Sequence, residues 1–458
     1  MLPALLLPLS VSQAQDVSRV IPPSGVIGVQ EAMLSPDYWI ARTAVADRQL
    51  LTPARIDAIN RESFATDPAL RYLSRIAPVL PQSQVAAWLK EASAPLTGPL
   101  VDAGGTPIPV ATLTAITANM GADRIAATAP ARYGLTVRRT PMRSFPSALK
   151  AYASKDSTDI EAFTAGVLFP GDAVIIVHDS FDRQWALVQT YQGPAWVAQA
   201  DIAEGPADKV FAYAGRTPFR VVTGDSVRTV NTPEAPELSE VQLDMGARLP
   251  IADVPPDQPV NGQGPSESWV VALPVRGTDG ALSIRPALLR KVHDSAAGYL
   301  PLTRANIIRQ AFKFLGERYG WGHQFNARDC SGFTSDVYRS MGVILPPNSG
   351  AQGKSPAFPH QLFAPTVSHE ERVRAIMQAD VGDLVVVPGH VLMILGKVAG
   401  QPYVIQDVPY AVFHDPQGKL RMTKINQVSV TPLLPLLANE HQSYADAMTS
   451  LVHVTAAR

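Results

Sequence analysis

Residues 329–333 are Asp329-Cys330-Ser331-Gly332-Phe333, and the motif Tyr319-Gly320-Trp321-Gly322 lies shortly before them. Cys330 is the only cysteine in a chain of 458 residues. It therefore cannot form a disulfide within the chain, and metal sites usually need more than one such ligand. A short loop followed by a predicted helix start suits a reactive thiol, because backbone N–H groups at a helix N-terminus favour the thiolate. A lone cysteine is most often a small buried apolar residue, but this context predicts a nucleophile.

A thiol nucleophile needs a base, a group that orients the base, and donors for the oxyanion that forms during attack. His390 begins a predicted strand after a β-rich run, and we expect it to be the base. Gln406 lies one predicted strand further on, and its side-chain carbonyl can fix the imidazole tautomer. His414 is the alternative for this role, although it follows a predicted loop. Backbone N–H groups around Cys330 are expected to supply oxyanion donors.

The composition excludes some partners. The chain has 39 Lys and Arg against 40 Asp and Glu, so no basic field indicates nucleic acid or an anionic membrane. Hydrophobic residues make up 46% and charged residues 17%, which is typical of a folded protein. The length allows roughly three or four domains. We expect a monomer.

The first residues are typical of an export signal. Met1 to Val11 are mostly apolar, and Ser12-Gln13-Ala14 resembles a cleavage site. The apolar run is too short to span a bilayer, and no other stretch suits a membrane helix. We therefore expect residues 1–15 to be a signal-like segment and the protein to be exported to the periplasm or cell envelope.

Sequence periodicity predicts four further regions. Thr52-Pro53 is typical of a helix start, and residues 16–125 are predicted to form a mostly helical module. Short alternating strands separated by Asp and Gly turns predict two small β-barrels, at 126–206 and 207–295. An apolar stripe after Thr303 predicts an amphipathic helix that opens the last domain, 296–458.

Taken together, the motifs of the last domain resemble the NlpC/P60 peptidase family. They occur in the family's order and spacing, and they are Tyr319-x-Trp321-Gly322, Asp329 to Phe333, Leu345 to Gln352, and Gly382-Asp383-Leu384 through Gly389-His390-Val391. The Tyr38-Trp39 region and the barrels resemble a subgroup with an N-terminal helical stabilising domain and two bacterial SH3-like domains. The expected fold is an α+β multidomain chain, with a papain-like catalytic domain preceded by a helical module and two SH3-like barrels.

The resemblance implies a reaction and its residues. The expected reaction is hydrolysis of the γ-D-glutamyl to diamino acid bond (meso-diaminopimelate or Lys) in peptidoglycan stem peptides or muropeptides. Cys330 is the implied nucleophile and His390 the implied base. The third residue is usually His, whereas this chain has Gln406, and His323 stands where a second Gly commonly follows Trp-Gly. No cofactor or metal is implied.

The resemblance also implies a substrate pocket. In relatives that recognise a free N-terminal L-Ala, the lining positions correspond to Tyr319, Asp329, Ser331 and Ser349. Asp329 is expected to pair with the ammonium group of that L-Ala. A structural interpretation stays open for three of them: Tyr319 as a core aromatic, Asp329 as a helix N-cap and Ser331 as a helix-start residue.

Two other functions remain open on the sequence. One is a catalytically silent protein that binds the cell wall through its barrels. The other is an amidase or acyltransferase on the same fold. The Cys330/His390 pair argues against the first, and the pocket of Tyr319, Asp329 and Ser349 favours a peptidase over the second.

Overall fold

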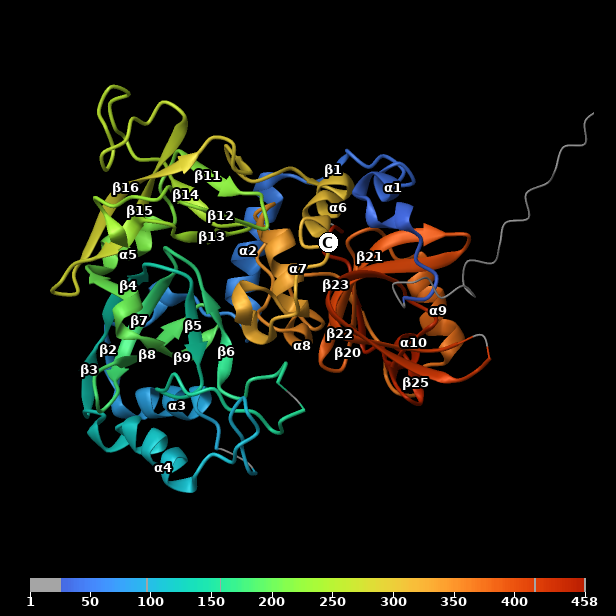
Figure 1. The fold of residues 1–458 in the computed structure, drawn as a ribbon, viewed down its shortest axis with the longest axis horizontal. Helices are drawn as coiled ribbons and strands as arrows, with labels where there is room; N and C mark the ends of the chain where they lie inside the picture. The colour runs from blue at the N-terminus through green and yellow to red at the C-terminus, as the bar shows by residue number, and fades with distance from the viewer. Residues whose placement is uncertain (1–25, 96–97, 157, 416, 457–458) are drawn as a thin grey trace, which may run out of the picture.

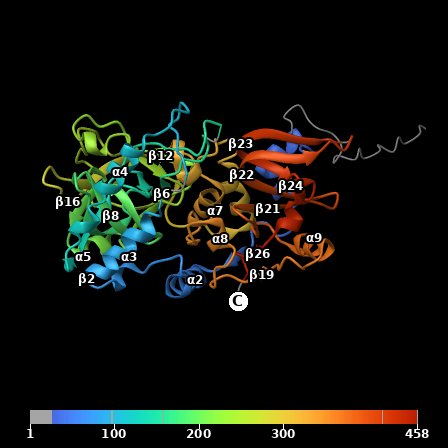
Figure 2. The same cartoon turned by 90° about the horizontal axis from the view of Figure 1, so that it is seen from below.

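The computed structural model describes residues 26–95, 98–156, 158–415 and 417–456. The predicted signal-like segment 1–15 lies outside the described residues. Figures 1 and 2 show the two barrels at one end of the molecule and the catalytic sheet at the other, with helix α7 (Cys330–Arg339) between them. No helix in the described ranges combines the length and the apolar character that crossing a membrane requires.

The N-terminal segment packs on two different neighbours. Its helices are α1 (Pro36–Ile40), α2 (Pro53–Thr66), α3 (Gln82–Ala92) and α4 (Val110–Asn119), with short strands β1 (Gln49–Leu51), β2 (Val79–Pro81) and β3 (Thr128–Pro130). Trp39 and Ile59 belong to the core of the catalytic domain, and β1 pairs with β18 (Leu302–Thr303) of that domain. Val85 and Leu89 of α3 pack instead on the core of the first barrel. The region predicted as one helical module is thus shared between two domains.

The first barrel is a seven-stranded antiparallel sheet in the order β10-β4-β7-β8-β9-β5-β6. Its strands are β4 (Arg132–Thr136), β5 (Thr140–Arg143), β6 (Thr164–Leu168), β7 (Ala173–Asp179), β8 (Trp185–Thr190), β9 (Gly193–Ala198) and β10 (Ile202–Gly205). Successive side chains of β7 point to opposite faces of the sheet, and both faces are covered. Val174 and Ile176 therefore lie in one apolar core and Ile175 in another. The long β5–β6 connection is fixed by Glu161, which accepts hydrogen bonds from Arg143 and from the backbone of Ala151 and Phe163.

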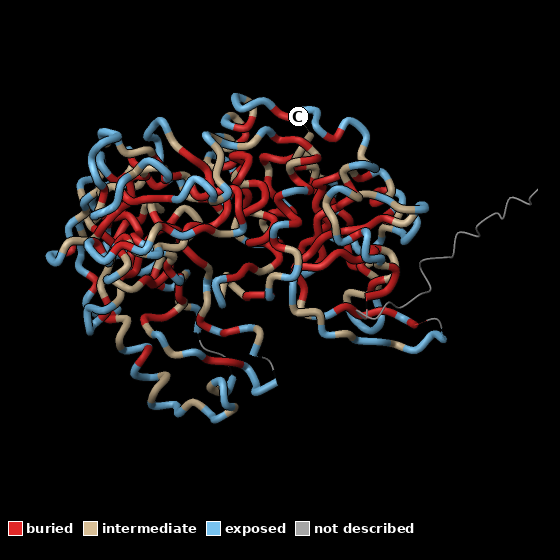
Figure 3. Tube along the Cα trace, turned by 45° about the horizontal axis from the view of Figure 1, so that its top comes forward, coloured by how far each residue is buried: buried red, intermediate tan, exposed pale blue. Residues whose placement is uncertain are grey.

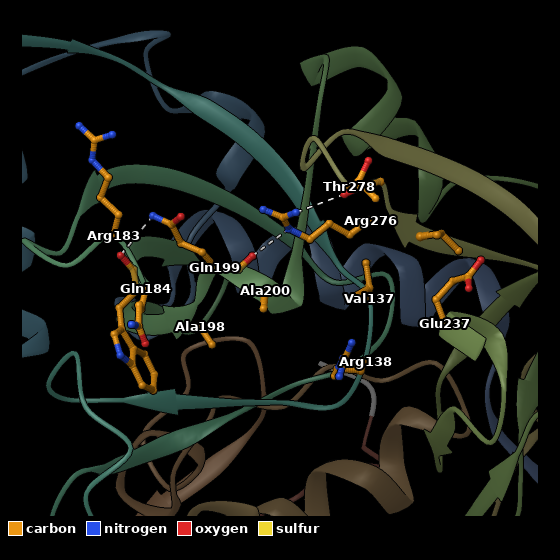
Figure 4. Close-up of a pocket in the computed structure, with 13 residues that line it drawn as sticks. Val137, Arg138, Arg183, Gln184, Ala198, Gln199, Ala200, Glu237, Arg276 and Thr278 are labelled. Atoms are coloured by element: carbon orange, nitrogen blue, oxygen red, sulfur yellow. Dashed lines mark hydrogen bonds between the residues drawn. The ribbon is translucent and has the colours of Figure 1, made fainter. Parts of the chain in front are cut away.

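The second barrel follows the short helix α5 (Ala207–Tyr213). Its strands are β11 (Phe219–Val222), β12 (Ser226–Arg228), β13 (Gln242–Asp244), β14 (Arg248–Pro250), β15 (Ser268–Arg276), β16 (Leu282–Arg290) and β17 (Ser295–Ala296). They form three small sheets around one apolar core. A groove of about 590 Å³ separates the barrels and is lined by Arg138, Arg183 and Arg276 (Figure 4). Arg276 donates a hydrogen bond across it to the carbonyl of Gln199.

The catalytic domain is an eight-stranded antiparallel sheet covered by helices on both faces. Its strands are β19 (His360–Leu362), β20 (Leu384–Val387), β21 (His390–Val398), β22 (Gln401–His414), β23 (Leu420–Pro432), β24 (Leu436–Asn439), β25 (Gln442–Ser443) and β26 (Ser450–Val452). One face packs on α6 (Arg304–Phe312) and α7, and the other on α9 (His369–Gln378) and α10 (Tyr444–Ala447). The helix that carries the thiol therefore lies directly on the sheet that carries the imidazole.

Two arginines join the three domains beside the thiol. Arg328 is 1% exposed and donates to Asp336 and Glu317 of the catalytic domain and to Asp244 of the second barrel. Arg139 of the first barrel binds the same Asp244. Figure 3 shows the resulting buried zone, which continues from the barrels through the central helices to the sheet. The domain junction is thus built around the residues that precede Cys330.

Candidate active site

Cys330 is the first residue of α7, and Asp329 caps that helix. One carboxylate oxygen of Asp329 accepts from the backbone N–H of Gly332 at 2.8 Å and the other from that of Gly322 at 3.0 Å. The Ser331 hydroxyl also donates to Asp329, at 2.9 Å. Asp329 therefore has the N-cap role that the sequence left open, and it ties the preceding loop to the helix.

The loop between Tyr319 and the nucleophile has an unusual backbone. His323, Phe325 and Asn326 all have positive φ, a conformation that costs non-glycine residues on the order of 1 kcal/mol or more each. The first barrel holds this loop, because Arg139 donates to the carbonyls of His323 and Ala327, at 2.9 Å each. Gln324 donates to Thr164 of β6 at 2.6 Å. The barrel thus fixes the conformation of the segment that leads into Cys330.

His323, one of the two departures from the family pattern, packs on the catalytic helix. A Cβ added to Gly332 would lie 2.4 Å from His323 Nε2, so only glycine fits beneath the ring. Burial lowers the pKa of His323 to about 3, and the imidazole is therefore neutral. His323 supports the first turn of α7 and supplies no charge to it.

His390, at the start of β21, is oriented by Gln406. His390 Nε2 and Gln406 Oε1 are 2.7 Å apart, and Gln406 in turn donates to Thr431 Oγ1 at 2.7 Å. Because the amide oxygen can only accept, Nε2 carries the proton and Nδ1 is left as the basic nitrogen. Burial lowers the pKa of His390, which keeps the imidazole neutral and able to accept a proton. The ring also stacks on Tyr444 at a centroid distance of 6.1 Å.

The alternative orienting residue, His414, lies elsewhere. It is the last residue of β22 and is exposed, while Gln406 is fully buried beside His390. The hydrogen bond to Gln406 is thus the contact that fixes the imidazole.

Gln406→Ala is expected to lower kcat by roughly 10- to 100-fold with little change in KM, because the lost contact serves the transition state. His414→Ala is the matched control and should leave both constants near wild type. Steady-state kinetics on one peptide substrate checks this. A large loss in His414→Ala with none in Gln406→Ala would contradict the assignment.

The sulfur of Cys330 faces the start of β21. The backbone N–H groups of Ser331 and Val391 hydrogen bond to the sulfur, and Val391 follows His390 directly. Burial and the Asp329 carboxylate nevertheless raise the pKa of the thiol above its usual range. This reverses the expectation of a thiolate favoured by the helix N-terminus. The thiol of Cys330 and the imidazole of His390 are therefore both uncharged.

The structure places the four predicted pocket residues around the nucleophile. Tyr319 is buried, and the nearby charges of Cys330 and Asp329 help to raise the pKa of its phenol, which stays protonated. Ser349 begins the short helix α8 (Ser349–Gln352). Gln352 of α8 donates to the carbonyl of Ser331 at 3.1 Å, which fixes α8 to the first turn of α7. All four thus lie on elements that meet at the thiol.

The first barrel also reaches the edge of this site. Asp159, in its β5–β6 connection, lies 3.7 Å from Arg318 and 3.5 Å from Lys424. Its charge also contributes to the raised pKa of the Tyr319 phenol. Barrel 1 therefore borders one end of the site.

Three residues at the site were not predicted from the sequence: Thr431, Tyr444 and Asp407. Thr431 and Tyr444 come from distant parts of the chain, and no local pattern marks them. Asp407 could have been noticed in the sequence, because it is an acidic residue inside a mostly apolar strand. Among the described residues, no group of three or more His, Cys, Asp or Glu side chains is arranged to hold a metal.

A thiol at a helix start, an imidazole on the facing sheet and an amide that orients the imidazole define a thiol hydrolase of papain-like fold. Two family models match the chain. Residues 148–198 match an SH3 domain of the SH3b1 type, and residues 316–421 match the NlpC/P60 family. The chain thus contains an NlpC/P60 domain, the domain of a family of cysteine peptidases, and an SH3 domain precedes it.

Three individual proteins are similar to this chain or to parts of it. An NlpC/P60 endopeptidase from Photobacterium damselae subsp. piscicida aligns with 91% of this chain and 96% of its own, with a TM-score of 0.70 and 15% identity. An NlpC/P60 family protein from Bacillus cereus aligns with 71% of this chain and 100% of its own, with a TM-score of 0.46 and 17% identity. A probable endopeptidase p60 of Listeria seeligeri is 51% identical over 47 residues, which span 10% of this chain and 9% of that protein. The Photobacterium protein thus shares the fold, and the Listeria protein shares a short segment.

Proposed function

We propose that this protein is a cysteine endopeptidase that hydrolyses the γ-D-glutamyl to diamino acid bond of peptidoglycan stem peptides. The observation that carries the proposal is that the sulfur of Cys330 lies beside the backbone N–H of Val391, which follows His390, and that Gln406 binds the His390 imidazole. The endopeptidase names of the Listeria and Photobacterium proteins support it. Export, which residues 1–15 predict, would bring the enzyme to this substrate.

The proposed hydrolysis proceeds through a thioester of Cys330. Cys330 attacks the γ-carbonyl while His390 Nδ1 takes the thiol proton, and a carbon–sulfur bond forms. The N–H groups near the sulfur and the protonated Tyr319 hydroxyl are available to the oxyanion. His390 then protonates the amine of the diamino acid, the carbon–nitrogen bond breaks, and a thioester remains. A water deprotonated by His390 hydrolyses the thioester and regenerates the thiol.

Asp329 is the group we propose for recognition of a free N-terminal L-Ala. It already accepts hydrogen bonds at both oxygens, but these come from neutral donors, and no cation among the residues that the structure describes forms an ion pair with it. A substrate ammonium would supply that cation. It would also weaken the repulsion that raises the pKa of Cys330, so the amine would favour proton transfer from the thiol. The first barrel borders one end of the site at Asp159. This border suits a short free peptide better than a stem peptide that is still attached to sugar.

Acetylating the L-Ala amine is therefore expected to lower kcat/KM by roughly 100-fold or more, because the charge is lost and bulk is added. Peptides with free and acetylated amines, assayed side by side, check this. Asp329→Asn, which keeps an N-cap, should reduce the preference for the free amine more than it slows the free peptide. Equal cleavage of both peptides, or efficient solubilisation of intact sacculi, would show that this end of the site is open. No cleavage of either peptide would instead support a silent wall-binding protein.

A further inference from the structure

Asp407 is a buried acid that the proposed reaction does not use. It follows Gln406 on β22, so its side chain points to the opposite face of the sheet, which packs on α7. The residue is 0% exposed. Neither carboxyl oxygen has a hydrogen-bond partner within the described part of the chain. A buried polar group without partners is rare and calls for a specific explanation.

The charges around Asp407 disfavour its ionisation. Asp329 and Glu317 lie close enough to repel a negative charge on it. Arg328 is the nearby cation, but its guanidinium is already bound by Asp336, Glu317 and Asp244. Burial and these two carboxylates raise the pKa of Asp407 to about 9, and Arg328 offsets only part of this rise.

Asp407 is also within electrostatic reach of the reacting groups. A charge on Asp407 raises the pKa of the Cys330 thiol and of the Tyr319 phenol. His390 and Gln406 bind each other, and the Asp407 carboxyl is not among the groups that shift the pKa of His390. The groups that Asp407 influences are therefore the nucleophile and a neighbouring hydroxyl, and not the base.

We propose that Asp407 is held as a neutral carboxylic acid behind the nucleophile, and that loss of its proton turns the enzyme off at alkaline pH. An ionised Asp407 places a negative charge near the sulfur, which opposes both the thiolate and the oxyanion. As pH rises through about 9, the rate should fall, even though alkali by itself favours thiol ionisation.

The test compares the wild type with Asp407→Asn, which copies the neutral acid, and with Glu370→Gln on the exposed face of α9 as the control. The wild type and the control should lose kcat/KM as pH rises through about 9. Asp407→Asn should keep kcat/KM near neutral pH within about threefold of the wild type and should not show this loss. An unchanged alkaline loss in Asp407→Asn would overturn the proposal.

A second readout does not depend on the peptide substrate. The rate of Cys330 alkylation by iodoacetamide reports the thiolate directly, and its midpoint should move to lower pH in Asp407→Asn. Infrared difference spectra of the wild type should also lose a carboxylic acid C=O band as pH passes about 9, whereas burial raises the pKa of Glu317 only to about 7. No shift of the alkylation midpoint, or no such band, would overturn the proposal whatever the natural substrate proves to be.

Discussion

Cys330→Ala is expected to abolish peptide hydrolysis, with a loss in kcat on the order of 10⁴- to 10⁶-fold. The thiol is the group that forms the covalent bond to the substrate, and no other cysteine in the chain can replace it. The remaining oxyanion donors and the pocket can only bind the peptide. Steady-state and single-turnover assays on one stem peptide measure the loss.

The same variant should keep its fold. Cys330 is 4% exposed and contributes a small side chain to a large apolar core, so its replacement by alanine removes one sulfur atom and no charge. Circular dichroism and thermal unfolding near those of the wild type are the control. Residual hydrolysis within about tenfold of the wild type would show that another group is the nucleophile.

Arg328→Met is expected to destabilise the protein by about 3–5 kcal/mol, because it removes the central cation from a buried network and leaves Glu317 without its ion pair. Asp244 and Asp336 are each almost fully buried. Arg339 and Arg139 still bind one of them each, but among the described residues Arg328 is the only cation that binds Glu317. The midpoint of urea unfolding measures the effect.

The matched control is Arg309→Met, at an exposed arginine whose side chain lies 3.6 Å from Asp47. It should change the unfolding free energy by roughly 0.5 kcal/mol or less. A loss of similar unfolding free energy in both variants would mean that the network at the domain junction adds no more stability than a surface ion pair. In Arg328→Met the destabilisation should also shrink at acid pH, since the orphaned carboxylates then take up protons.

The proposed catalytic residues could be selected from the sequence because each one lies in a local signal. Cys330 follows a loop and begins a helix, while His390 and Gln406 occupy successive strands. The N-cap role of Asp329 was visible for the same reason, since an acidic residue before a helix start is a common cap.

What the sequence could not show depends on contacts between distant segments. The division of the N-terminal helices between two domains follows from which apolar faces meet, as with Trp39 on the catalytic core and Val85 on barrel 1. The raised pKa of the Cys330 thiol is a similar case. The helix N-terminus is a local feature and favours a thiolate, but burial and the Asp329 carboxylate outweigh it in the folded site.

The central claim is that Cys330 cleaves the γ-D-glutamyl bond, and mass spectrometry of the products from L-Ala-γ-D-Glu-diaminopimelate tests it most directly. The account predicts two products from the wild-type enzyme, the dipeptide L-Ala-γ-D-Glu and free diaminopimelate, and neither from Cys330→Ala. Release of free L-Ala would place the cut at the other peptide bond. That result, or the same products from Cys330→Ala, would contradict the account.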